Sequence, residues 1–92
     1  MLVSIVDLSF PLSKQANRGL AAQWLGWELD RRGIVECDIC DADVILATSV
    51  DPIQVSILAR LRRLYPGKVL VCGGAASISP SVIGRNCDMV CV

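Results

Sequence analysis

Five short apolar runs recur along the chain, separated by helical or loop segments. They cover Leu2–Val6, Ile34–Ile39, Val44–Thr48, Lys68–Cys72 and Asp88–Val92. Continuous apolar runs of this length are typical of strands buried on both faces, as in parallel sheets. The composition agrees, because 53% of the residues are hydrophobic but only 4% are aromatic, so aliphatic side chains dominate. The pattern predicts an α/β fold with a mostly parallel five-stranded sheet, Rossmann-like or flavodoxin-like.

A first helix is expected from about Ser13 or Asn17 to Arg32, followed by Gly33 as a stop signal. A second helix begins with Asp51 as N-cap, then Pro52 and Gln54. A third, very short helix opens at Ser79–Pro80 and reaches about Arg85. The expected order is β-α-β-β-α-β-α-β, in one domain of residues 1–92.

The helical spacing also predicts which side chains face the core. In the first helix these are Ala21, Ala22, Leu25 and Leu29. In the second helix they are Ile57, Leu58, Leu61 and Leu64, with Arg60, Arg62 and Arg63 on a solvated face.

Two features depart from a regular parallel plan. The second and third strands are joined only by Cys40–Asp43, whereas a parallel crossover normally takes about a dozen residues. Either the second strand is short and the chain returns without a helix, or these two strands pair differently. The fifth strand also has no following helix, so a partner chain, self-association or a C-terminal continuation would have to cover that side.

The charge pattern argues against two classes of partner. Nine basic and nine acidic residues give a formal net charge of zero, so nothing indicates binding to nucleic acid or to an anionic membrane. No segment approaches the roughly 20 apolar residues of a membrane span. The five cysteines are an odd number and mostly lie in apolar runs, which favours thiols in a reducing compartment and a cytoplasmic protein.

Cys37 and Cys40 form a C-x-x-C pair that allows two further interpretations. Together with Cys87 or Cys91 they could hold zinc, and alone they could form a redox pair. The chain has no histidine and no second C-x-x-C, and a redox pair usually opens a helix. We therefore expect no metal site, and buried or edge thiols at these positions.

Ligands of open parallel sheets bind beyond the carboxyl ends of the strands. This rule indicates the loops Asp7–Leu12, Thr48–Asp51 and Gly73–Ser77. A glycine pair allows a flat ligand to approach the backbone closely, and hydroxyls beside a helix start suit a phosphate or polar tail. The alternative is that Gly73–Gly74 is only a tight turn and Thr48 only the end of a strand.

These loops carry a resemblance to a known family. Its elements are Asp43–Thr48, the capped helix, Lys68–Ala76 with its Gly-Gly pair, Pro80 and Cys87–Val92. Together with the first helix, from Gly19 to Gly33, the set resembles the cobalamin-binding domain found at the N-terminus of many radical SAM enzymes.

The resemblance implies cobalamin as cofactor and a radical SAM domain as partner. It implies that Thr48, with Ser49, contacts the nucleotide tail, that Gly73 and Gly74 pack against that tail, and that the loop containing Asp7 and Ser9 lies at the lower face of the corrin. Ser9 stands where the ligating histidine of other cobalamin proteins would fall, so a His-off type is implied. No C-x-x-x-C-x-x-C motif is present, so this chain has no catalytic residues for the radical chemistry.

The rival interpretation is a degenerate interaction or oligomerisation module without ligand. Trp24 and Trp27, on the first helix, would then mark an interface, as would the sheet edge. A nucleotide or flavin site is disfavoured because no glycine-rich phosphate motif follows the first strand. A phosphoacceptor receiver is disfavoured because Thr48, and not an aspartate, ends the central strand.

Overall fold

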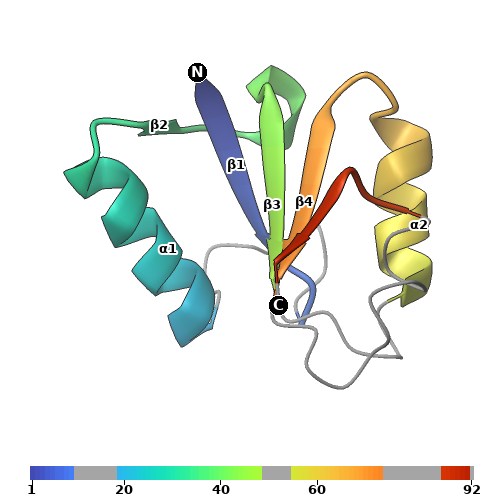
Figure 1. Ribbon diagram of the computed structural model, residues 1–92, viewed down its shortest axis with the longest axis horizontal. Coiled ribbons are helices and arrows are strands. Elements are labelled where there is room, and N and C mark those ends of the chain that lie inside the picture. Colours follow the sequence, from blue (N-terminus) through green and yellow to red (C-terminus); the bar gives the residue numbers. More distant parts are fainter. Residues whose placement is uncertain (10–18, 49–54, 74–85, 92) are drawn as a thin grey trace.

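The buried apolar runs form the strands of one all-parallel sheet in the computed structural model (Figure 1). The structure describes residues 1–9, 19–48, 55–73 and 86–91. The strands are β1 Leu2–Asp7, β2 Val35–Glu36, β3 Val44–Thr48, β4 Val69–Gly73 and β5 Met89–Cys91. The helices are α1 Leu20–Arg31, α2 Val55–Leu64 and the 3₁₀ turn η1 Ile39–Asp41.

The strands lie in the order β2-β1-β3-β4-β5, with every neighbouring pair parallel. This is the flavodoxin-like order of a doubly wound sheet. The predicted fold class is therefore confirmed. The Asp51 cap and the predicted third helix lie outside the described residues, so the full element order and the single domain over residues 1–92 stay predictions.

The short link between β2 and β3 has a simple geometric explanation. Strand β2 is only two residues long, and its Glu36 is level with Val3 of β1. Strand β3 begins at Val44, which is level with the same Val3. The link therefore has to cross β1 without travelling back along the sheet, and the single turn η1 suffices. This confirms the first alternative, a short second strand and a return without an α-helix.

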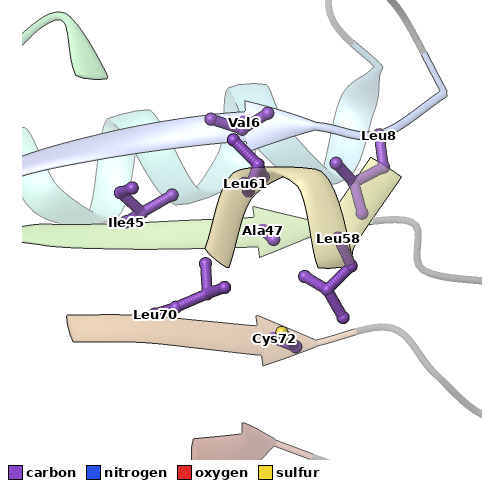
Figure 2. Close-up of a cluster of buried hydrophobic side chains, with 8 residues drawn as sticks. All are labelled: Val6, Leu8, Ile45, Ala47, Leu58, Leu61, Leu70 and Cys72. Atoms are coloured by element: carbon purple, nitrogen blue, oxygen red, sulfur yellow. The ribbon is translucent and has the colours of Figure 1, made fainter. Parts of the chain in front are cut away.

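The larger part of the core lies between the sheet and α2 (Figure 2). Leu58 and Leu61 are fully buried there, as predicted. Side chains on one face of the sheet complete the cluster, together with Leu8 directly after β1: Val6, Leu8, Ile45, Ala47, Leu70 and Cys72. Leu64 is 53% exposed, so its predicted inward position was wrong. Each three-residue step falls about 60° short of a full helical turn, so the drift carries Leu64 off the buried stripe.

Helix α1 lies on the opposite side of the sheet, against β1 and β2 (Figures 1 and 2). Ala22 is fully buried, and Leu25 and Leu29 are half-buried, as their spacing predicts. Ala21 is exposed, contrary to the prediction, because it lies about 100° around the helix from Ala22.

The end of α1 follows its predicted stop signal. Gly33 has a φ of 73°, in the left-handed region that favours glycine. Its N–H donates to the carbonyl of Asp30, and the Ile34 N–H donates to the carbonyl of Leu29. This pair of bonds is a Schellman motif, which satisfies carbonyl groups that the helix leaves open.

Neither of the described α-helices has the length and apolar character needed to cross a membrane.

Candidate functional site

The candidate site lies where the chain changes direction across the sheet. From β1 the chain passes to β2 on one side, and β3 follows on the other. In this strand order ligands bind at the carboxyl ends of β1 and β3. Asp7 ends β1 and Thr48 ends β3, and the two residues are direct neighbours in the register. The carboxyl ends of β1, β3 and β4 converge at the bottom of Figure 1.

Asp7 holds the loop after β1 to the start of α1. Its carboxylate is 2% exposed. One oxygen accepts a hydrogen bond from the Ser9 N–H at 2.9 Å, and the other accepts one from the Gly19 N–H at 2.7 Å. A Cβ atom at Gly19 would lie 2.9 Å from the same carboxylate oxygen, so glycine is the residue that permits this contact. Asp7 therefore has a structural role, whatever else it contacts.

Thr48 differs, because its hydroxyl is buried and forms no hydrogen bond within the part of the chain that the structure describes. The residue is 6% exposed, and its backbone carbonyl accepts a hydrogen bond from the Leu8 N–H at 3.1 Å. An unpaired buried hydroxyl costs about 1–3 kcal/mol of stability. Such a group at the edge where ligands bind is a candidate contact for a polar ligand atom.

The other predicted site residues divide into two sets. Ser9 is exposed and lies two residues after Asp7, and Gly73 ends β4, the neighbour of β3. The structure therefore brings Asp7, Ser9 and Thr48 to one edge, with Gly73 one strand further along. Ser49 and Gly74 lie outside the described residues.

The C-x-x-C pair lies at the opposite, amino end of the strands. Cys37 follows β2, and Cys40 is in η1. Burial raises the pKa of the Cys37 thiol, and the carboxylates of Asp41, Asp38 and Asp43 raise it further. A raised pKa lowers the thiolate fraction, so Cys37 is a weak nucleophile, which argues against a redox pair.

The remaining thiols have different surroundings. Cys72 is buried in the core as predicted, whereas Cys40 is exposed. Burial raises the pKa of the Tyr65 hydroxyl, and its interaction with Cys40 raises that pKa further. Within the described ranges, no three histidine, cysteine or carboxylate side chains are grouped to hold a metal ion.

A polar cluster at the amino end escaped the sequence analysis. Arg62, which was expected on a solvated face, donates to the carbonyls of Asn86 at 3.2 Å and Lys68 at 3.3 Å and to the Asp88 carboxylate at 2.7 Å. That carboxylate also accepts the Leu70 N–H at 2.8 Å. The N–H of Leu70 first, and then Arg62, lowers the pKa of Asp88. No local signal marks Asn86 and Asp88 as partners, because they lie 24 and 26 residues from Arg62 in the sequence.

Lys68 completes this cluster by holding the 3₁₀ turn. Its ammonium donates to the carbonyls of Cys40 at 3.0 Å and Ala42 at 2.6 Å. A cation therefore satisfies carbonyls that a turn of this length leaves open.

Comparison with known proteins adds no relative. No protein-family profile, curated protein or solved structure matches the chain. The flavodoxin-like assignment rests on the sheet topology, and the function has to be inferred from the site.

Proposed function

We propose that this chain is a cobalamin-binding domain of the His-off type that works with a radical SAM enzyme domain. The observation that carries the proposal is the buried, unpartnered hydroxyl of Thr48 at the β1/β3 edge. The resemblance over Asp43–Thr48 and Lys68–Ala76 assigns a hydroxyl at this position to the cofactor's nucleotide tail.

The residues of the edge fit a polar tail. A threonine hydroxyl can donate to a phosphate or amide oxygen and accept in return. Pairing the hydroxyl with such an atom would remove the cost of its burial, and that gain belongs to the bound state alone. A flat ligand would find glycine backbone at Gly73 and Gly74.

The residues present in this chain indicate what the protein supplies and what the cofactor supplies. A bound cobalamin supplies the cobalt chemistry. This chain supplies a binding edge, with Thr48 and the glycine pair at the tail and the Asp7–Ser9 turn beneath the corrin. Asp7 orients that turn, because its two carboxylate oxygens hold the Ser9 and Gly19 amides. A histidine ligand from this chain is impossible, since its sequence has none.

Hydroxocobalamin binding tests the proposal. The purified chain is incubated with hydroxocobalamin and desalted, and the retained red chromophore is measured by absorbance. Retention is expected for the chain as it stands. Thr48→Val, which keeps the side-chain shape and removes the hydroxyl, should weaken binding about tenfold, the effect of about 1.4 kcal/mol.

Arg63→Ala is the control, because it removes an exposed side chain from the last turn of α2, at the opposite end of that helix from the carboxyl edge. It should bind like the parent chain. Circular dichroism checks the fold of every variant. A folded chain that retains no chromophore would refute cobalamin binding, and retention unchanged by Thr48→Val would refute the role of Thr48.

A further inference from the structure

A groove separates α1 from the edge strand β2, far from the carboxyl edge described above. Its volume is about 610 Å³, and Gly26, Trp27, Asp30, Ile34, Val35 and Glu36 are among its lining residues. We refer to it as the α1–β2 groove. Strand β2 is the last strand on this side of the sheet, so the groove runs along a sheet edge.

Large apolar side chains at the groove are unusually exposed. Trp27 is 69% exposed and Val35 is 58% exposed. Tryptophan buries more apolar area than almost any other side chain when a partner covers it, and it is enriched among the residues that dominate binding. An edge strand can also accept another strand beside it.

The charged side chains that line the groove are acidic. Residues 33–59 contain no lysine or arginine. Asp30 and Glu36 line the groove, and Asp38 and Asp41 continue the acidic surface just beyond β2. The nearby Arg31 and Arg32 each form an ion pair with Glu28, at 2.8 Å and 3.6 Å.

This charge decides between two kinds of occupant. A second copy of the chain related by a twofold axis would place the same acidic edge opposite itself, and like charges across an interface are unfavourable. A segment rich in arginine or lysine meets the opposite charge. The self-association through the sheet edge or Trp24 and Trp27 considered from the sequence is therefore disfavoured at this edge.

We propose that the α1–β2 groove binds an extended, basic segment of another protein, laid alongside β2. Its arginine side chains pair with Asp30 in the groove and with Asp38 and Asp41 just beyond β2. Its apolar side chains cover Val35, and an arginine stacks on the Trp27 ring, as cations do on indole faces. This surface is independent of the cofactor proposal, because it lies at the opposite edge of β1 from β3.

The test uses a fluorescein-labelled peptide of alternating arginine and valine, with fluorescence anisotropy at low and high salt. We expect saturable binding that weakens with added salt. Trp27→Ala should weaken it by about tenfold or more. Trp24→Ala is the matched control, because Trp24 is also exposed on α1 but is not among the groove-lining residues, and it should change binding less than about twofold.

Charge reversal provides the second variant. Asp30→Lys combined with Asp38→Lys should weaken binding of the basic peptide about tenfold and allow a peptide of alternating glutamate and valine to bind. Both positions are exposed, and circular dichroism confirms folding. Equal binding of the two peptides by the parent chain, or no binding of either, would overturn the proposal. So would light scattering that shows a dimer that Trp27→Ala dissolves, because a second copy would then be the occupant.

Discussion

The amino and carboxyl ends of the sheet differ in how their polar groups are satisfied. At the amino end, Asp43 joins β1 to β3, because its carboxylate accepts the Leu2 N–H and its own N–H donates to the Leu2 carbonyl. Lys68 and the Arg62–Asp88 pair close the same end. At the carboxyl end, the Thr48 hydroxyl is buried and has no hydrogen-bond partner among the described residues.

This difference separates stability from binding. Polar groups at the amino end pair with one another, so they contribute to stability without a ligand. At the carboxyl end, burial of the Thr48 hydroxyl lowers stability, and a ligand that forms a hydrogen bond with it would remove that loss. Residues placed for binding are often not optimal for stability, which is the pattern expected of a functional edge.

The largest expected effect is a loss of stability on truncating core side chains, and it tests whether packing contributes equally near the two ends of the sheet. Figure 2 shows Leu58 on the side of Leu8, toward the carboxyl end, and Leu61 beside Val6, further toward the amino end. Both side chains are fully buried, so Leu58→Ala and Leu61→Ala should each lower the free energy of unfolding by about 2–5 kcal/mol in urea titrations.

Leu64→Ala is the control, because Leu64 is 53% exposed and should cost well under half as much. If the losses in the free energy of unfolding for Leu58→Ala and Leu61→Ala differ severalfold, the two ends of the sheet differ in packing and not only in their polar groups.

Arg62→Ala should give the next largest effect. It leaves the carbonyls of Asn86 and Lys68 without their charged donor, so a loss of about 1–2 kcal/mol is expected in the same titrations. Arg63→Ala removes an exposed arginine from the same helix and should stay within about 0.5 kcal/mol. A neutral result for Arg62→Ala would mean that water replaces the arginine without cost.

Thr48→Val should have the opposite sign. Replacing an unpaired buried hydroxyl with a methyl group of the same shape should leave stability unchanged or raise it by about 1 kcal/mol. Urea titration without ligand measures this change, with Ser56→Ala as the exposed control. A clear loss of stability would show that the hydroxyl is satisfied in solution, and would remove the contrast between the two ends.

The smallest effect is a pH dependence at the amino end. Folding lowers the pKa of Asp88, so its contribution to stability is present above the pKa of the unfolded chain and is lost as the pH falls through the folded-state pKa. The stability difference between the parent and Asp88→Asn should therefore be constant above about pH 5 and shrink below about pH 4. Urea titrations across this range measure it. A difference that does not change with pH would show that the carboxylate charge contributes nothing.

Much of the fold could be predicted because its signals are local. The Val44–Thr48 strand was predicted with its observed bounds, and Gly33 was correctly predicted to end α1. The errors arose at the edges of patterns. The expected strand Ile34–Ile39 shrinks to two residues, since part of it forms η1, and Leu64 drifts off the buried stripe.

The candidate site was predicted only as a set of strand ends. A general rule for parallel sheets indicated Asp7, Thr48 and Gly73. That rule does not reveal that Asp7 is already engaged by the Ser9 and Gly19 amides, or that Thr48 is not hydrogen-bonded. Both facts depend on segments that meet only in the folded chain.

The sequence by itself determined which segments carry strands and helices, and that α1 stops at Gly33, because hydrophobic period and turn chemistry act within about ten residues of the chain. Only the tertiary structure decided the pairing of Arg62 with Asp88, the short path from β2 to β3 and the exposure of Trp27 beside the sheet edge. These features depend on contacts between distant segments, whose geometry is settled when the whole sheet assembles. The burial of the Thr48 hydroxyl has the same origin, and it turns a common strand-end residue into the candidate contact for a ligand.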